Sequence, residues 1–115
     1  MIAVIFEAMP HADKKEEYFK IAAALKPTLE KMDGFISIER FQSFADPDKV
    51  LSLSFWRDEA SIQAWRNVEM HRYAQAKGRE SIFKDYHLRI AAVSRDYGIF
   101  DRQQAPADSK MAHEK

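Results

Sequence analysis

The residues best suited to chemistry lie in one stretch of predicted helix, "AWRNVEMHRYAQAKGRESIF", residues 64–83. At about 100° per residue, Trp65, His71 and Gln75 fall on one arc of that helix. A buried polar side chain without a hydrogen-bond partner costs about 1–3 kcal/mol, so this arc is a poor surface for packing against an apolar sheet. We therefore expect it to face polar groups or a cavity.

Small polar and aromatic residues are predicted to lie opposite this arc. Ser37 lies on one predicted strand, and Ser52 and Ser54 lie on another, in register with Trp56. Small side chains leave space between a helix and a sheet, and aromatic walls with a few polar groups are typical of a small-molecule pocket. The rings expected to bound this pocket are Trp65, Trp56, Phe83 and Tyr86. An alternative is that both tryptophans are ordinary core residues.

Two polar residues of the same stretch have simpler explanations as well. His71 has three possible roles: it contacts a ligand, it makes a structural hydrogen bond, or it lies at the helix edge in water. Arg79 follows Gly78, where it either reaches an anionic substrate or pairs with a surface acid.

Other catalytic signatures are missing from the sequence. The three glycines stand singly and form no phosphate loop. The histidines, at positions 11, 71, 87 and 113, include no pair at the i, i+4 spacing, so we expect no preformed metal site. Cysteine is absent, which excludes disulfides and thiolate chemistry, and no serine lies in a nucleophile elbow.

Length and charge restrict the class of protein further. A chain of 115 residues fits one domain, and its 18 Lys+Arg balance 18 Asp+Glu, so neither nucleic acid nor an anionic membrane surface is an expected partner. The N-terminal stretch lacks the basic region of a signal peptide, and no apolar run approaches the roughly 20 residues that span a bilayer. We expect a soluble, cytoplasmic protein.

The first half of the chain alternates between strand and helix patterns. Residues 2–9 alternate apolar side chains and stop at Pro10, which predicts a strand. Asp13 and Glu16 have the spacing of a capping box, so a helix is expected to begin there, and Pro27 should kink or split it. The runs "FISIERFQS" and "VLSLSFW", on either side of "FADPDK", predict a hairpin.

The second half adds one helix and one strand. Asp58 is a candidate cap for a helix that begins at about Glu59, is interrupted near Gly78 and resumes to about Phe83. Residues 85–100 are rich in β-branched and aromatic side chains and predict a long strand, the last regular element.

The resulting order, β-α-β-β-α-β, predicts an α+β, ferredoxin-like fold with both helices on one face of an antiparallel four-stranded sheet. The other face would carry residues such as Ala3, Ile5, Ile36 and Ile38, or their alternates. An exposed apolar patch of that size usually marks a partner, so we predict a homodimer formed sheet against sheet. We assign residues 1–100 to the domain and 101–115 to a loose tail with little apolar surface.

Several of these segments together resemble the antibiotic biosynthesis monooxygenase (ABM) domain family. They are "GFISIERFQS", "LSLSFWRDEASIQAW" and "HRYAQAKGR", and the resemblance covers residues 1–98. It implies a dimeric α+β barrel of two facing sheets, with a cavity in each subunit. The family includes cofactor-independent monooxygenases acting on aromatic polyketides, quinol monooxygenases, haem-degrading enzymes and small-metabolite isomerases.

The resemblance to the cofactor-independent members implies a monooxygenase that oxidises a small aromatic substrate with O₂ and needs neither metal nor flavin. Such an enzyme must deprotonate a phenol or quinol, and His71 is the candidate base. Gln75 and Arg79 would hold or stabilise the developing oxyanion, and the four aromatic residues named above would form the walls.

The resemblance to the haem-degrading members is incomplete. Trp65 matches their helix tryptophan, but Phe6 stands where they have an asparagine and Gln75 where they have the haem-ligating histidine, with His71 one turn earlier. Haem binding therefore remains an alternative. A third alternative is a non-catalytic, ligand-binding or stress-associated dimer.

Overall fold

The computed structural model describes the backbone of residues 1–75 and 82–113, and the side chains of residues 1–69 and 82–112. Its strands are β1 (Ile2–Pro10), β2 (Phe35–Gln42), β3 (Val50–Trp56) and β4 (Phe83–Ala92). Its helices are a short 3-10 turn η1 (Ala12–Lys14), α1 (Lys15–Glu30), α2 (Glu59–Gln75) and α4 (Ala107–His113).

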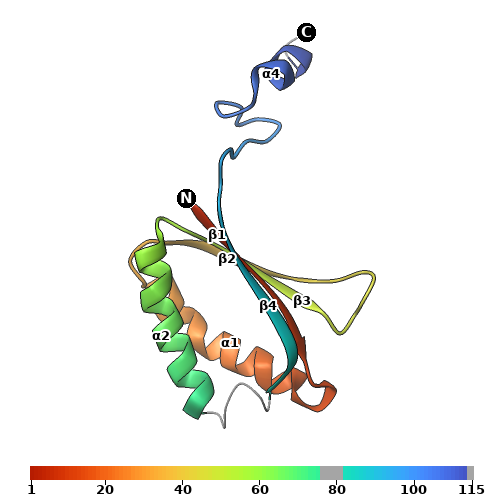
Figure 1. Cartoon of the computed structure of the whole chain (residues 1–115), viewed down its shortest axis with the longest axis vertical. Coiled ribbons are helices and arrows are strands. Elements are labelled where there is room, and N and C mark those ends of the chain that lie inside the picture. The colour runs from red at the N-terminus through yellow and green to blue at the C-terminus, as the bar shows by residue number, and fades with distance from the viewer. Residues whose placement is uncertain (76–81, 114–115) are drawn as a thin grey trace.

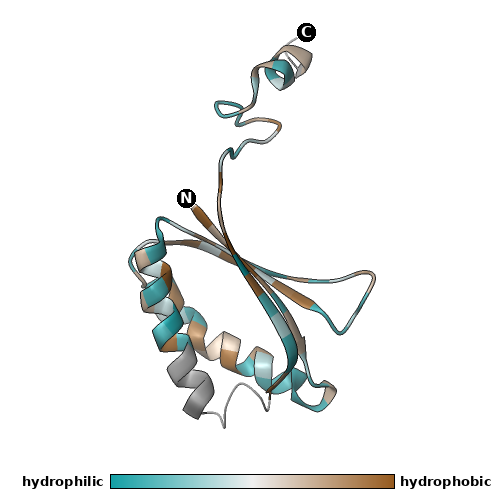
Figure 2. Cartoon of the chain, in the orientation of Figure 1, coloured by the Kyte–Doolittle hydropathy of each residue, from teal (hydrophilic) through white to brown (hydrophobic). Residues whose placement is uncertain are grey.

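The four strands form one antiparallel sheet in the order β2-β3-β1-β4, and α1 and α2 both lie on the same side of it (Figure 1). This arrangement confirms the predicted α+β, ferredoxin-like fold. Apolar segments concentrate on the strands and α1, whereas α2 is mostly hydrophilic over its described length (Figure 2).

Strand register decides which side chains face the helices. Val4 pairs with Ser54 and Ile90, and Ser54 pairs with Ile38, so these four side chains share the helix-covered face. Their neighbours along the strands therefore share the opposite, outer face. Of the apolar residues predicted for the outer face, Ala3 and Ile5 lie there, whereas Ile38 lies on the helix side.

A β-bulge in β2 explains this difference. Phe35 pairs with Trp56 and Ser37 pairs with Phe55, so Ile36 is an extra residue between two paired positions. The bulge shifts the alternation of the strand that follows. It places Ser37 on the outer face and leaves Ile36 52% exposed.

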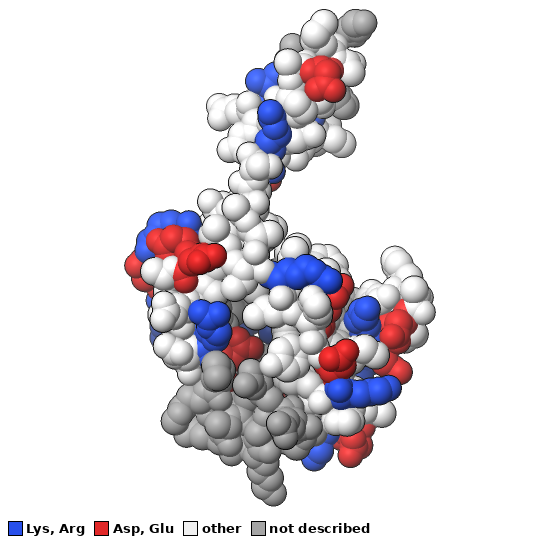
Figure 3. Space-filling model, viewed as in Figure 1, with Lys and Arg blue, Asp and Glu red and all other residues white. Residues whose placement is uncertain are grey.

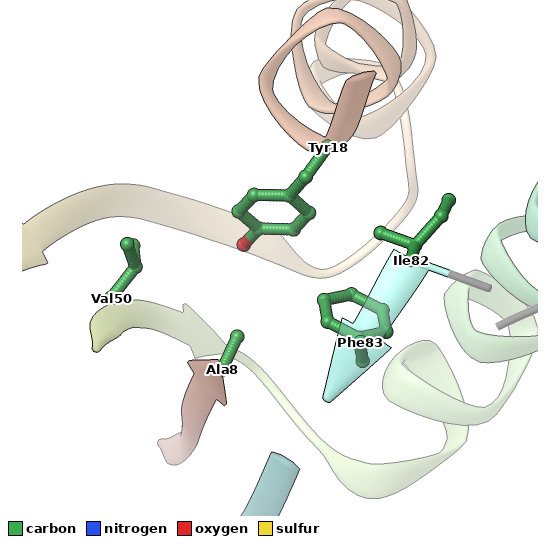
Figure 4. Close-up of a cluster of buried hydrophobic side chains, with 5 residues drawn as sticks. All are labelled: Ala8, Tyr18, Val50, Ile82 and Phe83. Atoms are coloured by element: carbon green, nitrogen blue, oxygen red, sulfur yellow. The ribbon is translucent and has the colours of Figure 1, made fainter. Parts of the chain in front are cut away.

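The core lies between the sheet and the two helices α1 and α2, in two clusters. One joins Tyr18 of α1 to Ala8, Val50, Ile82 and Phe83 (Figure 4). The other contains Leu29, Trp56 and Ile62, with Trp65 packed at its edge. The apolar stripe predicted for the first helix is confirmed, because its described buried members are Tyr18, Ala22, Leu25 and Leu29.

Three predictions about the elements are wrong. Asp13 lies inside η1, and neither η1 nor α1 has a side-chain cap hydrogen bond. Pro27 does not split α1, because buried Leu25 and Leu29 anchor the helix on both sides of it. The last strand begins at Phe83 and ends at Ala92 instead of residue 100, because its partner β1 begins at Ile2, which pairs with Ala92.

The end of the chain is an arm, residues 93–113, that extends away from the sheet (Figure 1). Arg102 donates hydrogen bonds to the Gly98 carbonyl and the Ser109 hydroxyl, each 2.8 Å long. The arm contains α4, so the expectation of no regular element beyond residue 100 is wrong. Its mobility and the domain boundary at residue 100 stay predictions. Ile99 and Phe100 are 72% and 97% exposed.

Candidate functional site

A cavity of about 140 Å³ lies between the inner face of the sheet and the two helices. All four strands contribute to it because the alternation of each strand sends every second side chain inward. Helix α1 supplies an apolar wall, and α2 supplies a mixed one. The residues that line the cavity include Phe6, Tyr18, Arg40, Ser52, Ser54, Trp56, Trp65, Arg66, Glu69, Phe83 and Tyr86.

Aromatic rings form one end of the cavity. Phe6 makes edge contacts with Phe83 and Tyr86 at centroid separations of 5.7 and 5.6 Å, and Phe83 and Tyr86 lie 5.8 Å apart. A second register shift, between Met9 and Pro10, pairs Pro10 with Phe83 and so brings that ring to the helix side. Edge-to-face packing of this kind gives a rigid apolar wall.

Trp56 forms the other end of the cavity and is completely buried. Its indole N–H donates a 2.9 Å hydrogen bond to the Ser54 hydroxyl, two residues earlier on the same face of β3. Phe35 packs edge-on against the ring at 5.3 Å. The orientation of this wall therefore depends on a small polar residue at an inward strand position.

Three charged side chains also line the cavity. Arg40, on β2, lies directly across from Ser52 on β3, and its Nε atom is buried without a hydrogen-bond partner. Arg66 and Glu69 line the cavity from α2. Arg66 is exposed, whereas Arg40 and Glu69 are half-buried.

Tyr18 contributes a phenol to the same region. Burial raises the pKa of this phenol above its usual value, and the neighbouring Arg40 guanidinium opposes that rise. The phenol therefore keeps its proton at neutral pH and can act as a hydrogen-bond donor.

Most of the predicted site residues that the structure describes come together in this cavity. Phe6, Ser52, Ser54, Trp56, Trp65, Phe83 and Tyr86 line it. Ser37 does not, because the bulge in β2 turns it to the outer face, where it is exposed.

The predicted polar arc of the second helix agrees less well with the residues that line the cavity. Trp65, the member whose side chain is described, lines the cavity, and it does so beside Ile62, Arg66 and Glu69, which were not predicted to face it. His71 and Gln75 lie on the described backbone of α2, but their side chains lie outside the described part. Arg79 and the break predicted near Gly78 lie outside the described residues.

Sequence reasoning missed Arg40, Tyr18 and Glu69. The signal for Arg40 was its place in "FISIERFQ", where an arginine occupies a position of the same parity as Ile38. Tyr18 was assigned only to the apolar stripe of the first helix, and Glu69 was read as one of the polar residues of a mostly polar helix.

The described residues contain neither a membrane-spanning helix nor a metal-binding cluster. No helix there is long and apolar enough to cross a membrane. That part of the chain also holds no group of three His, Asp or Glu side chains placed to bind a metal ion.

The fold and the cavity together define a class: a ferredoxin-like α+β domain with a small-molecule site between its sheet and its helices. The family model described as antibiotic biosynthesis monooxygenase matches residues 1–77. Because this match covers more than half of the chain, the protein belongs to that family.

The chain is similar to several known proteins. It is 47% identical, over 94 residues, to a protein of Pyricularia oryzae named jasmonate monooxygenase ABM; the match covers 82% of this chain but only 44% of that protein. The structure of Rv0793 from Mycobacterium tuberculosis superposes with a TM-score of 0.70 at 19% identity, covering 84% of this chain and 98% of Rv0793.

A third similar protein is the heme-degrader MhuD of Mycobacterium tuberculosis, whose structure holds two hemes in its active site. It superposes with a TM-score of 0.63 at 20% identity, covering 85% of this chain and 100% of MhuD. At these identities the two solved structures support the fold alone. The chain spans less than half the length of the jasmonate monooxygenase.

Proposed function

We propose that this chain is a cofactor-independent monooxygenase that oxidises a small, mostly apolar substrate with O₂ inside the cavity. The observation that carries the proposal is a cavity with aromatic walls and a few polar groups, in a chain of the antibiotic biosynthesis monooxygenase family. The first substrate class to test is a phenol, quinol or polyketide-like aromatic, because its anion can transfer an electron to O₂.

An anthrone illustrates the reaction. A base removes a proton from the activated CH₂ carbon, and the carbanion transfers one electron to O₂. The two radicals recombine to a peroxide, which loses water and leaves a carbonyl. The net change is CH₂ + O₂ → C=O + H₂O, so the substrate supplies all the electrons and no external reductant is consumed. Burial of the intermediate away from water prevents side reactions.

We propose His71 as the base, with Gln75 and Arg79 stabilising the anion, on the strength of the family resemblance. Among the lining residues, Glu69 is the described carboxylate that could accept a proton instead. The test is O₂ uptake with hydroquinones and anthrones by the wild type, His71→Ala and Glu69→Gln. Loss of uptake in His71→Ala alone is expected. Equal uptake by His71→Ala and the wild type would remove His71 from the base role.

A second candidate substrate is jasmonate, because a relative that is 47% identical is named a jasmonate monooxygenase. Incubation with jasmonate under ¹⁸O₂, followed by mass spectrometry, tests this substrate. A product heavier by one ¹⁸O atom is expected if jasmonate is oxidised. No incorporation from any substrate would favour the third alternative, a non-catalytic ligand-binding dimer.

Haem is the alternative cofactor, and the described site does not fit it well. The described lining residues offer no imidazole and no thioether for the iron, and Phe6 fills the place of the asparagine of the haem-degrading members. His71, whose side chain lies outside the described part, is the proposed haem ligand in this alternative. Titration of the protein with haem separates the two functions: we expect no Soret shift, and a saturable shift that His71→Ala abolishes would favour haem.

We also propose a homodimer formed through the outer faces of two sheets. Ile5 and Leu53 pair with each other on that face, and Leu53 and Phe55 are only half-buried although no described helix covers them. An uncovered apolar sheet face of this kind usually meets a partner. Sizing by light scattering should give a dimer that Leu53→Glu converts to a monomer. Ser37 is exposed on the same face, and Ser37→Glu tests whether the dimer tolerates a charge at the margin of the interface.

A further inference from the structure

Arg40 is a charged group in an apolar setting. It lies on β2 between Ile38 and the end of the strand, and its side chain borders a cavity whose other β-strand walls are mostly aliphatic and aromatic. A buried guanidinium is costly unless it is paired and hydrogen-bonded. Among the described residues, Arg40 has no ion pair, and its buried Nε has no acceptor.

Two other arginines of the described chain have ion pairs. Arg57 binds Asp33 and Asp58, and Arg89 binds Glu7 across the outer face. Lysines and arginines are spread among acids over the visible surface without a single-sign block (Figure 3). Two described arginines, Arg40 and Arg102, have a buried Nε without an acceptor, and Arg40 is the one of the two that lines the cavity, together with the carboxylate of Glu69.

The groups around Arg40 are hydrogen-bond donors that suit a carboxylate. Ser52 lies directly across the strand pair, and the Tyr18 phenol lies on the opposite wall with its proton retained at neutral pH. A guanidinium offers Nε and one Nη in a planar fork, and a carboxylate accepts both bonds in parallel. Most of the remaining cavity wall is apolar and would contact a hydrocarbon body.

We propose that the cavity binds an organic acid with an apolar body and that Arg40 holds its carboxylate, assisted by Ser52 and Tyr18. This inference rests on the proposed function, since it specifies which substrates the oxygenase site accepts. The carboxylate would sit at β2, and the body would extend toward the ring cluster of Phe6 and Phe83. Arg40 acts as a binding residue that orients the substrate.

The test uses two matched pairs: 3-phenylpropanoate with its methyl ester, and jasmonate with methyl jasmonate. Each pair shares one body and differs in the charge of the head group. Binding to the full chain is measured through the fluorescence of Trp56 and Trp65, which both line the cavity. At least one acid should bind the wild type about tenfold or more tightly than its ester, since a hydrogen bond to a charged group is lost in the ester.

Three variants test whether Arg40 causes the preference for the acid over the ester. Arg40→Gln should weaken binding of the acid by about 10- to 100-fold and leave the ester unchanged. Arg40→Lys keeps the positive charge but loses the planar pair of N–H donors, so its affinity for the acid should fall between those of the wild type and Arg40→Gln. Arg66→Gln is the matched control, because Arg66 borders the same cavity but is exposed; it should change acid binding by no more than about threefold. Urea unfolding of each variant checks that it folds.

Several outcomes would overturn the inference. They are equal binding of acid and ester by the wild type, no binding of any of the four compounds, or equal losses in Arg40→Gln and Arg66→Gln. None of these results decides the oxygenase proposal, which depends on O₂ uptake. Conversely, preferential binding of acids without any oxidation would support Arg40 as the anchor and count against the monooxygenase.

Discussion

The hydrogen bond between Trp56 and Ser54 offers a sharp test of how the cavity wall is held. Trp56 is fully buried, and its indole N–H donates to the Ser54 hydroxyl at 2.9 Å. Ser54→Ala removes the acceptor and leaves a buried donor unsatisfied, which costs about 1–3 kcal/mol of unfolding free energy. Ser52→Ala is the matched control, because Ser52 is buried on the same face of the same strand but does not bond Trp56.

Urea denaturation of both variants measures this difference. We expect Ser54→Ala to be less stable than Ser52→Ala by about 1 kcal/mol or more, with unchanged dependence on urea concentration. In a Trp56→Phe background the donor is gone, so the cost of Ser54→Ala should shrink toward that of Ser52→Ala. Equal losses for the two serine variants, or a Ser54→Ala cost that persists beside Trp56→Phe, would refute the role given to this bond.

Two further predictions concern the neighbouring turns that precede β2 and α2. Gly34 has φ +85°, and an added Cβ would collide with the Ser61 side chain, so Gly34→Ala should lose at least about 1 kcal/mol in thermal or urea unfolding. Gly98→Ala is its control, since a Cβ there meets open space, and a comparable loss in both would contradict the explanation. Asp58 accepts hydrogen bonds from the Ser61 backbone N–H and hydroxyl, which lower its pKa from 3.8 to about 2. A lowered folded pKa contributes stability that is present above about pH 4 and is lost as the pH falls through 2, so Asp58→Asn should flatten the acid-unfolding curve between those values. An unchanged curve in the Asn variant would show that other carboxylates control acid unfolding.

Local patterns in the sequence were sufficient to predict much of the fold. The alternation in residues 2–9 and 50–56 predicted the strands β1 and β3, and the stripe from Tyr18 to Leu29 predicted the buried face of α1. Asp58 was correctly predicted to cap α2, because Asx capping depends only on residues within one turn. The family resemblance is confirmed by the match over residues 1–77.

Parts of the site could not be predicted because they depend on strand pairing. A single extra residue, Ile36, reverses the faces of β2, so it removes Ser37 from the cavity and directs Arg40 toward it. Nothing local in "FISIERFQ" fixes the position of that bulge, since it is decided by how β2 pairs with β3. On α2, Trp65 lines the cavity as predicted, but Ile62, Arg66 and Glu69 were not predicted to, because a mostly polar helix has no apolar stripe from which its orientation can be read.

The sequence by itself determined the order of strands and helices, the aromatic and serine content of the cavity, and the family. These properties follow from periodicity and residue type, which are local. Only the tertiary structure decided that an arginine whose Nε has no acceptor among the described residues lines the cavity and that the last strand ends at Ala92, where its pairing with β1 ends. Both depend on contacts between segments far apart in the chain, and such contacts form only when the sheet is assembled.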